Sequence, residues 1–230
     1  MAASLTRLMI SLNLEYLLLD KALSEDLIEI IEVNKEGSVQ DLKVNNHSSL
    51  MVLILDGEEL VGAKQNRVVN TTILVKGNSE LVIPVSCVEE GRWSYGSPNF
   101  QSQDRIMPSS LRGKKSEQVY QSIKNVGKFK ANQGAIWDEI ASKASRRGAE
   151  SPSMAMADIY EKDHPSIQKY VKHFRLIDSQ VGAIFMINGK VVGMDAVGKP
   201  GTFQKYLKNW WRAMPLMLSI GLILRKNTNP

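Results

Sequence analysis

Two short polar blocks hold most of the side chains in this sequence that could perform chemistry. Residues 56–67 combine carboxylates, amides, a lysine and an arginine, and residues 86–93 combine a cysteine, two glutamates and an arginine. Between the blocks lie two apolar runs typical of buried strands, 68–75 and 81–85. Ionisable and amide side chains beside buried strands are costly unless they are paired. The pattern therefore indicates a site within residues 56–93.

Carboxylates are the candidates for catalysis. Glu58 and Glu59 lie in the first block, and Glu89 and Glu90 lie in the second. Carboxylates that are held together serve general acid–base chemistry or bind a divalent cation through oxygen. We predict catalytic roles for Glu58, Glu59 and Glu89. The alternative is that these glutamates form structural ion pairs with neighbouring lysine and arginine side chains.

Cationic and amide side chains are the candidates for ligand binding. They are Lys64, Gln65, Asn66, Arg67 and Arg92. Such donors suit a phosphate, a carboxylate or the edge of a nucleobase. The alternative is a hydrogen-bonded network that ties neighbouring strands together, because buried polar groups are satisfied as a rule.

Cys87 and three aromatic residues complete the candidate chemistry. A nucleophilic thiol needs a nearby base or cation, and neither block contains a histidine, so a buried core thiol is favoured at Cys87. Trp93, Tyr95 and Phe100 could stack on a base or pin a loop to the core. One cysteine and three scattered histidines exclude a cysteine-based zinc site and do not suggest a histidine-rich metal site. No glycine-rich fingerprint for a phosphate or dinucleotide cofactor is present.

A hairpin is expected to bring the two blocks together. The runs 67–75 and 80–88 are predicted to be strands that flank the loop 76–79. A slip of one residue would reverse the faces, but the blocks would still meet. Pro84 predicts an edge strand or a bulge. The expected register pairs Val75 with Glu80, Val68 with Cys87, Asn66 with Glu89 and Gln65 with Glu90.

The rest of the chain predicts an α+β fold, in which a β-rich, sandwich-like N-terminal part precedes a helical segment and a C-terminal β-hairpin plus helix. The run 50–55 is apolar on both faces and predicts a fully covered central strand. Residues 91–113 predict a long excursion or lid. Further strands are predicted at 28–33, 39–44, 181–187 and 190–197. Helices are predicted at 14–24, 114–126, 134–147, 154–162, from Pro165 and after a Thr202 cap.

The charge distribution limits the classes of partner. The net charge is +5, yet residues 105–147 carry ten Lys or Arg against three Asp or Glu. A basic segment without a recognised motif makes nucleic-acid binding the weakest alternative. The apolar tail from Met214 to Leu224 is shorter than the roughly 20 residues that a spanning helix needs. We therefore predict a cytoplasmic protein without a membrane partner.

The two blocks resemble a known family. Residues 56–70 (DGEELVGAKQNRVVN) and 83–93 (IPVSCVEEGRW) closely resemble the ARG and Rhodanese-Phosphatase-superfamily-associated protein domain, an uncharacterised family. Further similar strings are 132–140, 153–160, 180–185 and 189–195. In the string 132–140, the resemblance implies that the Gln133 side chain points toward the site formed by the two blocks. It also implies a single domain over 14–213 and an atypical tail over 214–230.

The family's name implies an association with ADP-ribosylglycohydrolases and with the rhodanese-phosphatase superfamily. The leading hypothesis is therefore a domain that binds or processes a small, anionic, nucleotide-like metabolite related to ADP-ribose or NAD. The alternative is a non-catalytic interaction module that scaffolds protein partners.

Overall fold

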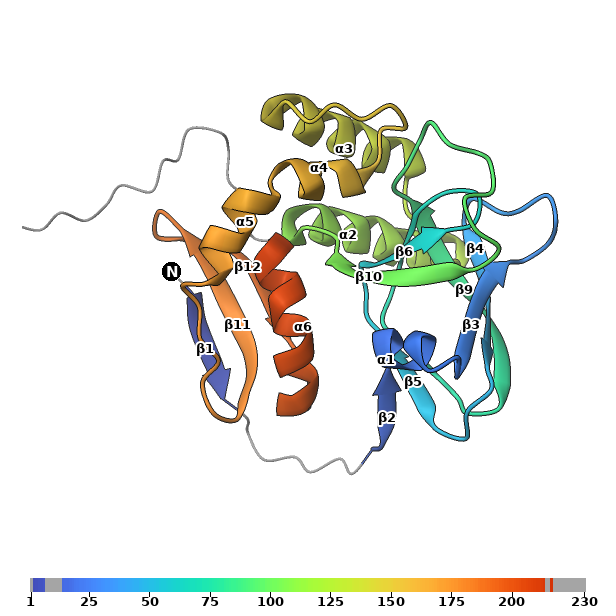
Figure 1. Cartoon of the computed structure of the whole chain (residues 1–230), viewed down its shortest axis with the longest axis horizontal. Coiled ribbons are helices and arrows are strands. Elements are labelled where there is room, and N and C mark those ends of the chain that lie inside the picture. The colour runs from blue at the N-terminus through green and yellow to red at the C-terminus, as the bar shows by residue number, and fades with distance from the viewer. Residues whose placement is uncertain (1, 7–13, 214–215, 217–230) are drawn as a thin grey trace, which may run out of the picture.

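The chain adopts the α+β fold that the sequence predicts, with sheets in the N-terminal part, helices in the middle and a hairpin plus helix at the end (Figure 1). This computed structural model describes residues 2–6, 14–213 and 216. Apart from Leu216, the predicted tail over 214–230 lies outside the described residues.

A six-stranded antiparallel sheet dominates the N-terminal part, in the order β10-β6-β7-β9-β4-β3. Its edge strands approach each other, because the Asn99 amide beside β10 donates to the Glu29 carboxylate of β3 at 3.2 Å. The sheet therefore curls upon itself. Its strands are β3 (Ile28–Glu32), β4 (Asp41–Asn46), β6 (Glu58–Gly62), β7 (Arg67–Val69), β9 (Ser79–Cys87) and β10 (Phe100–Ile106).

A second, three-stranded sheet shares its core with the first. It contains β2 (Tyr16–Leu18), β5 (Met51–Ile54) and β8 (Ile73–Val75), with β5 in the middle. Helix α1 (Leu19–Ser24) packs into the same core. Alternate residues of β5 are buried, so one face of this strand, not both, is fully covered. The apolar residues of the run 50–55 continue onto the half-buried face, which is why the sequence predicts a strand covered on both faces.

The hairpin predicted between the two polar blocks is wrong in detail, although the blocks do converge. Strand β8 leaves the first sheet and pairs with β5, so Val75 lies opposite Val52. The shorter β7 pairs with β9 in a register shifted by one residue, with Arg67 opposite Cys87. The chain departs after Asn70, whose side chain bonds Ser86 at 2.7 Å and the Phe129 carbonyl at 3.0 Å.

Three further local predictions are corrected by the structure. Strand β9 is internal, and Pro84 is tolerated at the end of its ladder with β4. The predicted excursion over 91–113 contains β10, whose Phe100 is fully buried. The predicted helix over 14–24 is divided between β2 and α1.

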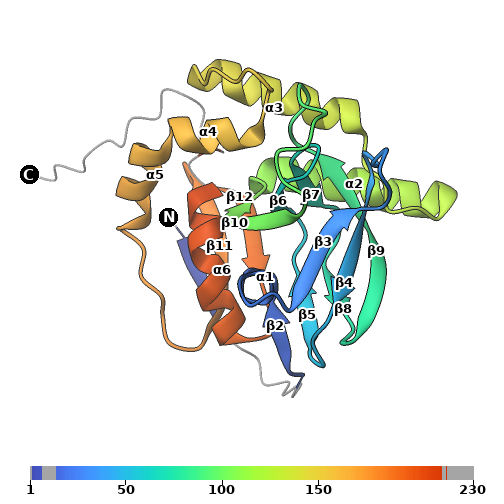
Figure 2. The same ribbon diagram turned by 45° about the vertical axis from the view of Figure 1, so that its right-hand side comes forward.

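The helical segment and the C-terminal elements cover one side of the β-rich part. Helix α6 lies between that part and a small sheet ordered β1-β11-β12 (Figures 1 and 2). Thr202 lies inside α6, where it bonds the Tyr16 hydroxyl at 2.7 Å, and does not cap the helix. The helices are α2 (Ser109–Val126), α3 (Gln133–Arg147), α4 (Met156–Lys162), α5 (His164–Val171) and α6 (Pro200–Ala213). The strands are β1 (Ala2–Thr6), β11 (Gln180–Ile187) and β12 (Lys190–Ala196).

Along the described ranges, no helix has both the length and the apolar character needed to cross a membrane.

A buried lysine fastens α2 to the curled sheet. The Lys115 ammonium is fully buried, forms an ion pair with Asp56, and donates to the carbonyls of Val69 at 3.2 Å and Asn70 at 3.0 Å. Burial lowers the pKa of Lys115, and Asp56 opposes that shift. The turn after β5 and the end of β7 are therefore held by one helix side chain.

We predict that Asp56→Ala lowers the free energy of unfolding by about 3 kcal/mol, because it leaves the Lys115 charge buried without a counter-ion. Urea denaturation measures this change. Combining Asp56→Ala with Lys115→Met is expected to recover part of the loss, since no unpaired charge remains. Equal losses in the single and double variants would contradict the argument.

Candidate functional site

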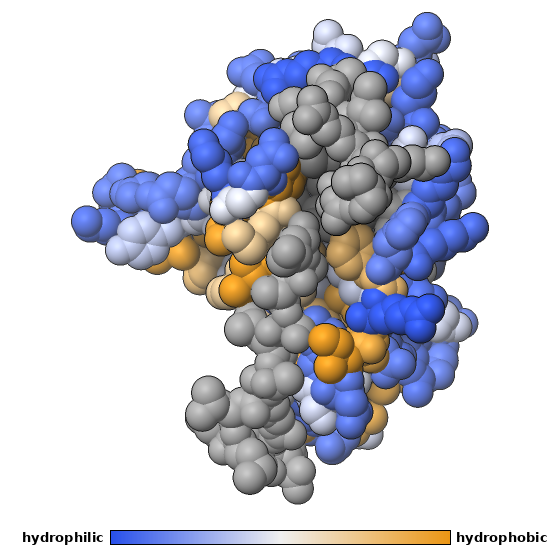
Figure 3. All heavy atoms as spheres, turned by 90° about the vertical axis from the view of Figure 1, so that its left-hand side faces the viewer, coloured by the Kyte–Doolittle hydropathy of each residue, from blue (hydrophilic) through white to orange (hydrophobic). Residues whose placement is uncertain are grey.

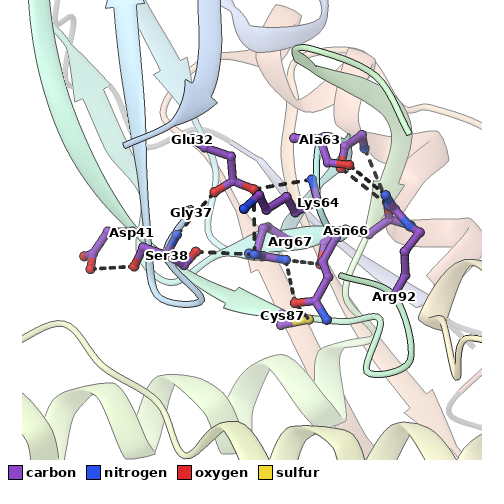
Figure 4. Close-up of polar contacts among 12 residues, drawn as sticks. Glu32, Gly37, Ser38, Asp41, Ala63, Lys64, Asn66, Arg67, Cys87 and Arg92 are labelled. Atoms are coloured by element: carbon purple, nitrogen blue, oxygen red, sulfur yellow. Dashed lines mark hydrogen bonds and ion pairs between the residues drawn. The ribbon is translucent and has the colours of Figure 1, made fainter. Parts of the chain in front are cut away.

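The two polar blocks meet where β7 lies beside β9. The turn between β6 and β7 carries Lys64, Gln65 and Asn66, and the chain after β9 carries Glu89 and Arg92. Ladder bonds between β7 and β9 continue past the strand ends, since the Val88 N–H donates to the Asn66 carbonyl at 3.0 Å. This continuation holds the blocks side by side (Figure 4).

A buried guanidinium forms the centre of the site. The Arg67 side chain is 0% exposed. Its Nη1 donates to the Gln65 side-chain oxygen at 3.2 Å, and its Nη2 donates to the Ser38 carbonyl at 3.3 Å. The only described carboxylate within ion-pair distance is Glu32, at 4.0 Å. The Nε of Arg67 has no hydrogen-bond partner among the described residues. We call Glu32, Lys64, Gln65, Arg67 and Cys87 the Arg67 cluster.

Lys64 brings a second cation to this cluster. Its Nζ donates to the Glu36 carbonyl at 2.6 Å and lies 5.3 Å from the ring centroids of both Trp93 and Tyr95. Trp93 also lies 5.7 Å from the Arg67 guanidinium carbon. These distances are those of cation–π contacts. The two residues are 47% and 55% exposed, so Trp93 presents accessible surface beside both largely buried cations and Tyr95 beside Lys64.

Cys87 lies under the guanidinium as a buried thiol. Its Sγ is 3.0 Å from both the Gln65 side-chain oxygen and the Glu89 carbonyl oxygen, either of which can accept the thiol proton. Burial raises the pKa of Cys87, and the Arg67 charge opposes that shift. The sulfur is fully buried, as the sequence favours. A neutral thiol supplies no charge to balance Arg67.

Glu89 and Arg92 form a second cluster beside the first, with Asn66 and Ser153. One Glu89 oxygen accepts from Arg92 Nη2 at 2.7 Å and from the Asn66 backbone N–H at 3.0 Å, and the other accepts from Ser153 at 2.8 Å. Arg92 also donates to the Ala63 carbonyl at 2.7 Å. We call this group the Glu89 cluster. It fixes the turn before β7 to the loop after β9 and to the chain before α4.

Gln133 lies next to the Arg67 cluster and binds backbone. Its amide accepts from the Cys87 N–H at 2.8 Å and donates to the Cys87 carbonyl at 2.7 Å. This pair of bonds continues the sheet with a side chain and docks the first turn of α3 on β9. Asn132 caps the same helix by accepting from the Ala135 N–H at 3.1 Å.

Two of the predicted catalytic glutamates lie away from the Arg67 cluster. Glu58 faces α6, where its carboxylate accepts from the Tyr206 hydroxyl at 2.8 Å. Glu59, on the opposite face of β6, forms a buried ion pair with Arg105 at 2.5 Å. Burial raises the pKa of Glu59, although Arg105 opposes the shift. Successive residues of a strand point to opposite faces, so these neighbours could not share one site.

The structure adds site residues that the sequence does not point to. Glu32 ends β3, and the carbonyls of Glu36 and Ser38 come from the β3–β4 loop, residues 33–40. Backbone carbonyls leave no signal in the amino-acid pattern. Glu32 falls in phase with the buried Ile28 and Ile30 of β3, and this inward position in the alternation is the signal that could have found it.

The balance of charge decides what the site can bind. Three cations, Lys64, Arg67 and Arg92, face two carboxylates, Glu32 and Glu89, among the described residues of the two clusters. Arginine stays protonated in proteins, so burial does not remove its charge. The site therefore carries one excess positive charge and suits an anion. Across the described ranges, no three His, Cys, Asp or Glu side chains gather closely enough to hold a metal ion.

We predict that Glu89 makes the stability of this protein depend on acid pH. Burial opposes ionisation of Glu89, but hydrogen bonds from Arg92, the Asn66 backbone N–H and Ser153 lower its pKa on balance. Its contribution is thus present above the unfolded-state pKa of about 4.3 and is lost as pH falls through the lower folded-state pKa.

Glu89→Gln is expected to cost about 2 kcal/mol of unfolding free energy at pH 7 and progressively less toward pH 3. Denaturant unfolding at a series of pH values measures the difference. The exposed Glu117 provides the control, since Glu117→Gln is expected to stay within about 0.5 kcal/mol. A Glu89→Gln cost that does not change with pH would contradict the prediction.

Comparison with known proteins identifies the family. The model of the ARG and Rhodanese-Phosphatase-superfamily-associated Protein domain matches residues 4–217. The match reaches further at both ends than the similar strings in the sequence. No curated protein and no solved structure matches the chain significantly. Because the family model covers most of its length, the chain belongs to the ARG and Rhodanese-Phosphatase-superfamily-associated Protein domain family.

Proposed function

We propose that this protein binds a small, anionic, nucleotide-like metabolite at the Arg67 cluster. The observation that carries the proposal is the excess positive charge of a cluster whose central guanidinium is 0% exposed. An isolated charge is expensive to bury unless an opposite charge accompanies it. Arg67 has one carboxylate at the limit of ion-pair distance, so a bound anion would supply the missing partner.

The aromatic rings beside the cations support a nucleotide over a simple anion. Trp93 and Tyr95 each keep about half of their surface exposed while lying against Lys64. Stacking of a base on an aromatic ring contributes about 1–3 kcal/mol. A ligand with a phosphate and a base could engage Arg67 and one of these rings together. In this proposal Arg67 and Lys64 hold the phosphate, and Gln65 orients it.

The family name supports a relation to ADP-ribose or NAD, since it associates the domain with the ARG and rhodanese-phosphatase superfamily context. Processing of the ligand is part of the same hypothesis. Glu89 is the predicted catalytic carboxylate nearest to the ligand-binding residues, through its bond to Arg92. Catalytic roles for Glu58, Glu59 and Glu89 stay predictions.

We predict that isothermal titration detects binding of ADP-ribose or NAD to the wild-type protein. Trp93→Ala is expected to weaken that binding about tenfold, because it removes the stacking ring. Tyr120→Ala is the matched control, since Tyr120 is a similarly exposed aromatic residue, 57% exposed, on α2. The control should bind as the wild type does. Absence of heat with ADP-ribose, NAD and pyrophosphate alike would contradict the proposed function.

A non-catalytic interaction module is the second candidate, and two observations favour it. The Glu89 cluster is already satisfied internally, as a structural network requires. Exposed apolar residues are also present, including Val191 and Met194 of β12 at 64% and 61%. On the face that Figure 3 shows, apolar side chains lie in patches among hydrophilic ones. For a module of this kind, Arg67→Ala and Glu89→Ala would lower the melting temperature without a separable loss of metabolite binding.

A further inference from the structure

The β3–β4 loop closes the Arg67 cluster from solvent. Lys64 is 9% exposed and Arg67 is 0% exposed, so neither cation is open to a ligand in this arrangement. The Gly37 backbone lies close to the side chains of Lys64 and Trp93. A Cβ atom there would lie 3.0 Å from Lys64 Cδ and 3.4 Å from the Trp93 ring, and the φ angle of +79° favours glycine. Movement of this loop would uncover both cations, since its carbonyls contact Lys64 and Arg67 directly.

Polar contacts hold the loop to the site. No side chain of residues 33–40 is fully buried, and its only two apolar side chains, Val33 and Val39, are half-buried, so opening the loop exposes a limited apolar area. Its contacts with the site are hydrogen bonds between loop backbone groups and the ionic side chains of the site. The Glu36 carbonyl accepts from Lys64. The Ser38 carbonyl accepts from Arg67, and the Ser38 N–H donates to Glu32 at 3.4 Å (Figure 4).

We infer that the β3–β4 loop is a gate whose carbonyls occupy the positions that a diphosphate takes when it binds. This inference rests on the proposed function and adds a ligand group and a means of regulation to it. Two carbonyl oxygens from residues 36 and 38 satisfy two separate cationic donors. A diphosphate offers charged oxygens on two linked phosphorus atoms, and it can therefore replace both carbonyls at once. Charged acceptors bind these donors more strongly than neutral carbonyls do.

The gate also explains how an excess cation is tolerated without ligand. Carbonyl dipoles solvate Lys64 and Arg67 in the closed form but do not neutralise them. An anion gains the charge interaction and gives up only the loop's hydrogen bonds. Because closed molecules cannot bind, the apparent dissociation constant is raised by the inverse of the open fraction. Any change that loosens the loop without touching the cations should therefore tighten binding.

Ser38→Ala is the change that separates the gate from the binding residues. The Ser38 hydroxyl makes its hydrogen bonds within the loop and with the first residue of β4, donating to Asp41 at 3.2 Å and accepting from the Gln40 N–H at 3.3 Å. Ser79→Ala is the matched control, because Ser79 makes one hydroxyl bond, to the Lys76 carbonyl at 2.6 Å, at the opposite end of β9. Neither serine side chain contacts Lys64 or Arg67 through a described hydrogen bond.

The test combines hydrogen–deuterium exchange of residues 33–40 with calorimetric titration of inorganic pyrophosphate. Ser38→Ala is expected to exchange about fivefold faster in this segment and to bind pyrophosphate about fivefold more tightly, while Ser79→Ala matches the wild type. Saturating pyrophosphate should speed exchange of 33–40 in the wild type, and orthophosphate, with one phosphorus atom, should bind more weakly.

The outcomes distinguish the two proposals. Binding of pyrophosphate with unchanged exchange of 33–40, and with equal affinity in Ser38→Ala, would overturn the gate and leave the proposed function standing. Absence of pyrophosphate, ADP-ribose and NAD binding in both the wild type and Ser38→Ala would overturn the proposed function and the gate together. Orthophosphate binding as tight as that of pyrophosphate would overturn the assignment of a diphosphate.

Discussion

The burial of the Arg67 guanidinium is the constraint on which the rest of the site depends. A charge on an internal strand of the curled sheet, with no access to water, must be surrounded by acceptors. Gln65, Ser38 and Glu32 supply them from three different segments. Each acceptor then needs its own support, so the polar residues around Arg67 form a connected set and not a collection of independent surface groups.

The need to pair buried polar and charged groups also places the neighbouring elements. Gln133 binds both backbone groups of Cys87 and docks α3 beneath the cluster, while Lys115 fastens α2 to the turn after β5. The Glu89 cluster joins the loop after β9 to the chain before α4. Polar side chains therefore connect the β-rich part to the helices through hydrogen bonds and ion pairs. The apolar core that the strands and helices share connects them as well.

These connections also shape the proposed chemistry. Most predicted binding residues hold one another in place, which leaves Arg67 and Lys64 as the cations whose charge is incompletely balanced. Binding at such a pair depends on what covers it, and the cover is a loop without buried side chains. A rigid base with a cover that can open locally is the arrangement expected of a site whose access is gated.

The sequence by itself determined the α+β class, the C-terminal hairpin, in whose turn Asn188 and Gly189 have positive φ angles, and the convergence of the two polar blocks. These features follow from local periodicity and turn chemistry, which are written in neighbouring residues. It did not determine the register of β9, the pairing of β8 with β5, or the separation of Glu58 from Glu59. Those depend on which distant strand offers the better apolar face and on polar anchors such as Asn70. Tertiary structure alone decided that Glu32 and two loop carbonyls complete the site, because a backbone oxygen carries no amino-acid identity and a charge imbalance exists only once the chain has folded.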